Sequence, residues 1–304
     1  MYKLAVSADL SPARVPALGT EDSRVYLRPA TLAQAVQWLS ESPAQILAGG
    51  TDFFPALGEA PARGPVLDVS AIREIREIST GAEFIRIGGG VSWTEVIAAP
   101  LPRGFGALQS AAREVGSIQI QNRATVAGNL CNASPAADGV PPLLALDAIV
   151  ELVSASGIRR VALEDFILDN RKTARRPDEI LASVLIPRRW QDASSSFLKL
   201  GARRYLVISI VMTAVSIMRD AAGRVADARV AVGSCSAKAL RLHALERLLI
   251  GKNARPGLSC AASTEHLAGL APIDDVRSTA VYREEAALTL VRRAIEDCVK
   301  GGKA

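Results

Sequence analysis

The spacing of apolar residues in the first third of the chain predicts alternating strands and helices. Apolar side chains at positions 32, 35, 36 and 39 fall on one helical face, directly after Thr31, a residue type that often caps helices. Similar helical spacing recurs at residues 71–74, 93–98 and 105–115. Short apolar runs predict strands at residues 45–48, 66–69 and 84–87. This rhythm predicts a small α/β lobe.

The remainder of the chain has shorter apolar alternations that predict antiparallel strands. They occur at residues 148–153, 159–163 and 180–186. Residues 190–196 are mostly polar and predict a linker. Beyond it, strand patterns at residues 209–218 and 228–232 precede helical patterns at residues 240–250, 259–267 and 283–299. This part therefore predicts a second domain of antiparallel strands and helices.

A run of small and amide residues is the first candidate for a binding site. Residues 117–147 contain Thr125, Gly128, Asn129, Ser134 and Asp138. Small side chains let backbone N–H groups approach an anion, and the polar ones can bind sugar hydroxyls. A second glycine-rich turn, in which a Cβ would block a pyrophosphate, consists of Ala48, Gly49, Gly50, Thr51 and Asp52. Together the two stretches predict a dinucleotide held by the backbone.

Composition narrows the possible functions. The 304 residues include 36 basic and 31 acidic side chains, and the net charge of +5 is spread over arginine pairs. Because no basic stripe is interleaved with aromatic residues, nucleic-acid binding is not predicted. The four cysteines lack the C-x-x-C spacing of zinc or iron–sulfur sites, so no metal is predicted on this chain. No apolar run approaches the roughly 20 residues of a membrane span, and a cytoplasmic location is expected.

The ordered set of motifs resembles a known family. AGGTD at residues 48–52 and TVAGNLCNASPAAD at residues 125–138 look like the paired FAD-binding motifs of molybdenum-hydroxylase flavoprotein subunits. That family includes the FAD subunits of bacterial xanthine dehydrogenase and carbon monoxide dehydrogenase. Further matches are NRKT at residues 170–173, PDEIL at residues 177–181 and FLKLGARR at residues 197–204. The resemblance runs from about Tyr26 to the C-terminus.

The resemblance implies an α+β fold with two domains. Residues 25–189 would form a two-lobed FAD-binding domain of the vanillyl-alcohol-oxidase type. Residues 194–299 would form a C-terminal antiparallel sheet with helices, and residues 1–24 are predicted to be a flexible extension. FAD is expected to bind non-covalently, because no histidine lies near the N-terminal motif, where covalently flavinylated relatives often carry one.

The resemblance also implies roles for individual residues, each with a simpler alternative. Asp138 would hydrogen-bond hydroxyls of the FAD sugar chain, or else cap a following helix. Leu181 would lie at the flavin, or else belong to the core. Lys199 would reach the pyrimidine end of the flavin, where positive charge stabilises the reduced form, or else lie on the surface. Three polar residues would contact the cofactor or merely stabilise their own turns: Thr125, Asn129 and Ser134.

The function that the resemblance implies is electron transfer within a heteromeric oxidoreductase. A large partner subunit with a molybdenum cofactor would oxidise the substrate, a small [2Fe-2S] partner would relay electrons, and FAD on this chain would pass them to an acceptor such as NAD+. No catalytic residue is predicted on this chain, because its two histidines, His243 and His266, are far in sequence from the candidate site. The alternatives are a self-contained flavin oxidase or reductase of the same fold, and an FAD-less subunit that only scaffolds its partners.

Overall fold

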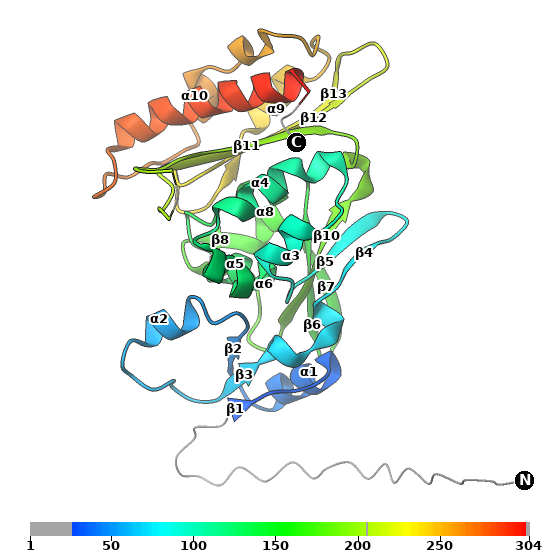
Figure 1. The fold of residues 1–304 in the computed structure, drawn as a ribbon, viewed down its shortest axis with the longest axis vertical. Helices are drawn as coiled ribbons and strands as arrows, with labels where there is room; N and C mark the ends of the chain where they lie inside the picture. Colours follow the sequence, from blue (N-terminus) through cyan, green and yellow to red (C-terminus); the bar gives the residue numbers. More distant parts are fainter. Residues whose placement is uncertain (1–25, 205, 302–304) are drawn as a thin grey trace, which may run out of the picture.

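The protein, described as a computed structural model over residues 26–204 and 206–301, has two domains arranged along its long axis (Figure 1). Its N-terminal lobe contains β1 (Tyr26–Leu27), α1 (Leu32–Glu41), β2 (Gln45–Leu47), α2 (Phe53–Leu57) and β3 (Val66–Asp68). The strands pair in parallel in the order β1-β3-β2. The Thr31 hydroxyl accepts a hydrogen bond from the Gln34 N–H at 3.2 Å, so α1 begins at the predicted cap. Ala35 and Leu39 then bury the apolar face of α1 in a core with Leu67.

The second lobe is built on a five-stranded antiparallel sheet. Its order is β4 (Ile78–Thr80), β5 (Phe84–Gly88), β10 (Ile180–Pro187), β6 (Ile149–Ser154) and β7 (Gly157–Ala162). Residues 180–186 of the central β10 are all buried, which explains their uninterrupted small and apolar sequence. Trp93, Phe105 and Leu143 pack with Ile87 and Val184 in the core between helices and sheet.

Six short helices and one hairpin complete the second lobe. The helices are α3 (Trp93–Ala98), α4 (Gly106–Glu114), α5 (Ile118–Arg123), α6 (Val126–Asn132), α7 (Val140–Leu144) and α8 (Leu163–Phe166). The hairpin consists of β8 (Ile167–Asp169) and β9 (Lys172–Thr173). Helices α5, α6 and α7 occupy most of residues 117–147, the run of small and amide residues that the sequence predicted as a binding site.

The C-terminal domain is a four-stranded antiparallel sheet covered by helices on one face (Figure 1). The sheet has the order β11 (Ser194–Leu200), β12 (Val211–Arg219), β13 (Val225–Gly233) and β14 (Leu240–Arg241), and the helices are α9 (His243–Leu249) and α10 (Ala280–Val299). Along β12 the side chains alternate between two cores. Val211 and Val215 pack in the core that includes α10, whereas Met212 and Ala214 pack with Ala107 of α4. The second face of the sheet therefore joins the domains.

Most predicted elements are confirmed, and the exceptions have local causes. The strand predicted at residues 84–87 exists as β5, but it belongs to the five-stranded sheet and not to the N-terminal lobe. The linker predicted at residues 190–196 is wrong, because Trp190 is fully buried and β11 begins at Ser194. The helical pattern at 240–250 starts with the short strand β14. The patterns at 71–74 and 259–267 form only 3₁₀ turns. The extension predicted at residues 1–24 lies outside the described residues.

Two features are absent from the described residues: a membrane-spanning helix and a cluster of metal-binding side chains. No helix of residues 26–204 and 206–301 is long and apolar enough to cross a membrane. In the same ranges no cluster of histidine, cysteine and carboxylate side chains is arranged to hold a metal ion. Cys131, Cys235, Cys260 and Cys298 are free thiols.

Candidate cofactor site

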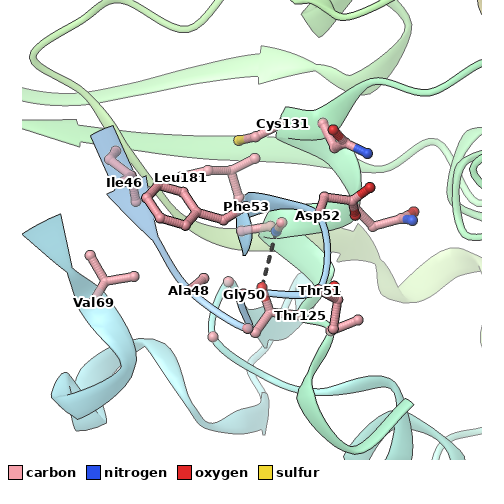
Figure 2. Close-up of a pocket in the computed structure, with 18 of the residues that line it drawn as sticks. Ile46, Ala48, Gly50, Thr51, Asp52, Phe53, Val69, Thr125, Cys131 and Leu181 are labelled. Carbon is pink, nitrogen blue, oxygen red and sulfur yellow. Dashed lines mark hydrogen bonds between the residues drawn. The ribbon is translucent and has the colours of Figure 1, made fainter. Parts of the chain in front are cut away.

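A cavity of about 640 Å³ lies where the N-terminal lobe meets the second lobe. Figure 2 shows the turn from Ala48 to Asp52 along one wall, with Thr125 beside it and Leu181 and Cys131 on other walls. Nine of the residues predicted from the sequence line the cavity: Ala48, Gly49, Gly50, Thr51, Asp52, Thr125, Gly128, Asn129 and Leu181. The structure thus brings together two motifs that are more than 70 residues apart in the sequence.

The glycines of the first motif are needed for packing against the second. A Cβ at Gly49 would lie 2.0 Å from the carbonyl oxygen of Arg123, the last residue of α5. Gly50 has a φ of 79°, in the left-handed region that favours glycine. The sequence predicted glycine here because a Cβ would block a pyrophosphate. At Gly49 the reason is different, because a Cβ would clash with the protein's own backbone.

The second motif caps α6 and uses its own backbone donors. The Thr125 hydroxyl accepts a hydrogen bond from the Gly128 N–H at 3.0 Å, and the Asn129 N–H donates to the Thr125 carbonyl at 3.0 Å. The Val126 and Ala127 N–H groups donate at 2.9 Å to carbonyls in the turn after β5. These four N–H groups are therefore satisfied within the protein. The prediction of free backbone donors is therefore wrong for residues 126–129.

A run of three free backbone donors lies in the first motif. Within the described part of the chain, the N–H groups of Gly49, Gly50 and Thr51 make no hydrogen bond to any other residue. All three residues line the cavity. Consecutive N–H groups in a turn that contains a left-handed residue form a concave site for phosphate or other anions. This turn is therefore a candidate anion-binding feature of the cavity.

Asn129 supplies a second group that suits a polar ligand. Its Oδ1 atom is buried and has no hydrogen-bond partner among the described residues. This oxygen lies beside Gly139, 2.9 Å from the position of a Cβ added there, and Gly139 does not line the cavity. Asn129 also lines the cavity, and its Nδ2 atom, not the enclosed Oδ1 atom, is therefore the suitable contact for a bound cofactor.

Several residues of the cavity were not singled out from the sequence. Gly89 and Gly90 come from the turn after β5, and Arg171 and Arg175 flank β9. The triple-glycine run at residues 88–90 was a usable signal, whereas nothing in the sequence placed the two arginines there. Cys131 also lines the cavity, and burial raises the pKa of its thiol to about 11, against the opposing charge of Arg175. It is therefore protonated at neutral pH.

Asp138 does not line the cavity. Its side chain instead connects the two domains. It is 7% exposed, and its carboxylate accepts hydrogen bonds from the Lys199 Nζ at 2.7 Å and the Ser209 Oγ at 2.6 Å. Burial raises the pKa of Asp138, although the charge of Lys199 opposes this shift. The alternative role as a helix cap is wrong, because the cap of α7 is Gly139 and no side chain bonds there.

Lys199 and Ser134 also do not line the cavity. The Lys199 side chain is 8% exposed and also donates to the Glu114 carbonyl at 3.1 Å, so the surface alternative for this lysine is wrong. The Ser134 hydroxyl accepts a hydrogen bond from the Ala136 N–H at 3.3 Å. Direct contacts of Asp138, Lys199 and Ser134 with the cofactor stay predictions.

The chain matches two family descriptions that together cover most of its length. Residues 19–189 match the FAD binding domain in molybdopterin dehydrogenase. Residues 196–298 match the CO dehydrogenase flavoprotein C-terminal domain.

Curated relatives and solved structures agree with these matches. A nicotinate dehydrogenase FAD-subunit of Eubacterium barkeri is 33% identical over 234 residues, covering 74% of this chain and 79% of the relative. A putative xanthine dehydrogenase FAD-binding subunit of Escherichia coli is 31% identical over 291 residues, covering 93% of this chain and 99% of the relative. A solved carbon monoxide dehydrogenase from Hydrogenophaga pseudoflava matches with a TM-score of 0.82 and 26% identity, covering 91% of this chain and 97% of that one. This chain therefore belongs to the family of FAD-binding subunits of the molybdenum hydroxylases.

Proposed function

We propose that this chain carries non-covalent FAD in the cavity between its lobes and transfers electrons within a heteromeric molybdenum hydroxylase. A small subunit with [2Fe-2S] clusters would deliver the electrons, and an acceptor such as NAD+ would receive them. A large subunit with the molybdenum cofactor would oxidise the substrate. The observation that carries the proposal is the row of free N–H groups at Gly49, Gly50 and Thr51, inside a cavity that both sequence motifs line.

Different residues of the cavity would bind different parts of FAD. The free N–H groups of residues 49–51 would donate to the pyrophosphate, and the Asn129 amide would pair with a polar group of the cofactor. Leu181 would contact the flavin, as the resemblance implies, from the wall formed by β10. Bound FAD supplies the redox chemistry, whereas the protein binds and orients it. Asp138 and Lys199 would act from behind the cavity by fixing the second domain.

The two alternatives make different demands on the site. A scaffold that has lost FAD would not need unpaired backbone donors in a cavity. A self-contained oxidase would need its own groups to bind and deprotonate a substrate. Family membership favours the subunit function. A cytoplasmic location stays a prediction from the sequence.

Reconstitution tests the cofactor assignment. The purified chain is expected to bind one FAD, and unfolding in guanidinium should release all of it into the filtrate. Flavin absorbance that stays with the unfolded polypeptide would contradict non-covalent binding. A folded chain that takes up no FAD at all would contradict the assignment itself.

The subunit role requires a separate measurement. With FAD bound, the isolated chain is expected not to oxidise purines, aldehydes or other hydroxylase substrates. Addition of the iron–sulfur and molybdenum subunits should restore flavin reduction by substrate, followed through flavin absorbance. Turnover of such a substrate by the isolated, metal-free chain would favour the self-contained flavoenzyme.

A further inference from the structure

The helix α7 connects the cofactor motif to the interface between the domains. Its five residues are all buried, and its first turn contains two consecutive prolines. One carboxylate lies just before it, at Asp138, and another lies three residues after it, at Asp147. Both carboxylates bind cations of the C-terminal domain: Lys199 at the start of the helix, and Arg229 and Arg241 at its end. The C-terminal domain therefore holds α7 at both ends.

Asp147 has the denser set of partners. Its Oδ1 atom accepts from Arg229 Nε at 2.7 Å and Arg241 Nη1 at 3.0 Å. Its Oδ2 atom accepts from the Trp190 indole N–H at 3.0 Å and from Arg189. Burial alone would raise the pKa of Asp147, but the hydrogen bonds and charges of these arginines lower it. The carboxylate is thus ionised at neutral pH.

The backbone of Asp147 is also constrained. Its φ of 51° lies in the left-handed region, which few residues other than glycine adopt. Such a conformation persists when surrounding contacts determine it. Here four donors from three separate segments determine it, and only 18% of the Asp147 side chain is exposed.

A chain of contacts leads from this cluster to the cavity. The arginines fix β13 and β14 against the end of α7, and β12 and β11 belong to the same sheet. From β11, Lys199 reaches Asp138 and the Glu114 carbonyl at the end of α4. The next residue, Val115, lines the cavity. A displacement of the C-terminal domain would therefore move the cavity wall at Val115 and release the Asp138 carboxylate.

We propose that Asp147 is a positioning residue for the cofactor site. It holds the C-terminal domain in the one orientation in which Lys199 can bind Asp138 and Glu114 together. This inference rests on the proposed function, because it assumes that the cavity binds FAD. Asp147 does not line the cavity, and within the described residues its side chain makes no hydrogen bond to a residue that does.

Asp227 provides a matched control. It lies on β13 and binds two of the same arginines, Arg189 and Arg229, and within the described residues its side chain makes no hydrogen bond or ion pair to α7 or Asp147. A substitution there weakens the same charge cluster without removing the link to α7. Both side chains are similarly exposed, at 17% and 18%.

The test compares Asp147→Asn, Asp147→Glu and Asp227→Asn by fluorescence titration with FAD, at a temperature where each variant is folded. Asp147→Asn is expected to weaken FAD binding about tenfold and to shift the absorption maximum of the bound flavin. Asp147→Glu, which keeps the charge, should recover most of the affinity. Asp227→Asn should lower the unfolding temperature but leave the FAD affinity within about twofold of the wild type.

Other outcomes distinguish failure of the positioning role of Asp147 from failure of the proposed function. An Asp147→Asn protein with wild-type FAD affinity and flavin spectrum overturns the positioning role, even if its unfolding temperature falls. Equal loss of affinity in Asp227→Asn also overturns it. If Asp147→Asn does not fold, Arg241→Gln removes one partner and must give the same pattern. A wild-type chain that does not bind FAD contradicts the proposed function before any variant is measured.

Discussion

Substitution of Gly49 by alanine tests how the two cofactor motifs fit together. The added Cβ would lie 2.0 Å from the Arg123 carbonyl oxygen, 2.7 Å from its carbon and 3.0 Å from the Ala124 Cα. All three obstructing atoms belong to the backbone, so no side chain can rotate away. The two turns must separate by about 1 Å, because contacts to a Cβ shorter than 3.0 Å are essentially never observed.

Gly49→Ala is expected to lower both the stability of the protein and its affinity for FAD. Overpacking of this kind destabilises a protein by about 1–3 kcal/mol. Separation of the turns also displaces the free N–H groups at residues 49–51 from the cofactor, and loss of one hydrogen bond to a charged group costs about 1.5–3 kcal/mol. The expected result for Gly49→Ala is a lower unfolding temperature and an FAD affinity roughly ten to a hundred times weaker.

Thermal unfolding of the apo-protein and fluorescence titration with FAD measure the two effects separately. Gly269→Ala is the control, because a Cβ at Gly269 meets nothing within 4 Å. If Gly49→Ala matched this control in both unfolding temperature and FAD affinity, the packing argument would be refuted. Loss of stability with unchanged affinity would show that the free donors of the first motif do not bind the cofactor.

Two further predictions concern buried carboxylates. Asp138→Ala leaves the Lys199 ammonium buried without its carboxylate and should lower the free energy of unfolding, measured in urea, by about 3–5 kcal/mol. The double variant Asp138→Asn, Lys199→Met should recover much of this stability. Equal losses of stability in both proteins would contradict the pairing. Glu179 is 3% exposed and binds Arg159 at 2.8 Å. Burial alone would raise the pKa of Glu179, but hydrogen bonds from Arg159 and the Arg176 N–H lower it below 4.5. The stability it confers is therefore complete above pH 4.5 and is lost as the pH falls through the lower folded value. Glu179→Gln should destabilise the protein by about 1–2 kcal/mol at pH 7, and the difference from the wild type should shrink below pH 4.5; a constant difference down to pH 3 would contradict the assignment.

The sequence predicted the cavity far better than it predicted the domain interface. AGGTD and the run of small and amide residues around Thr125 were recognisable because small residues in a fixed order are a local signal. The bond between Asp138 and Lys199 was not predictable in this way, because its partners are 61 residues apart and belong to different domains. Periodicity describes one element at a time and does not describe how elements pack together.

Two local errors have the same origin. The polar composition of residues 190–196 predicted a linker, but Trp190 is fully buried with its indole N–H bonded to Asp147. The small residues after Thr125 suggested free backbone donors, but carbonyls in the turn after β5 accept hydrogen bonds from the N–H groups of Val126 and Ala127. In both cases a long-range contact decides the environment of a short segment, and that contact is not encoded in the segment itself.

The distribution of the three tryptophans has a practical consequence for spectroscopy. Trp38 lies on α1 in the N-terminal lobe. Trp93 packs beside Gly139 in the second lobe, and Trp190 lies within about 5 Å of the guanidinium groups of Arg189 and Arg229 at the domain interface. Each indole therefore lies in a different region, so variants that retain a single tryptophan would report separately on the N-terminal lobe, the second lobe and the domain interface.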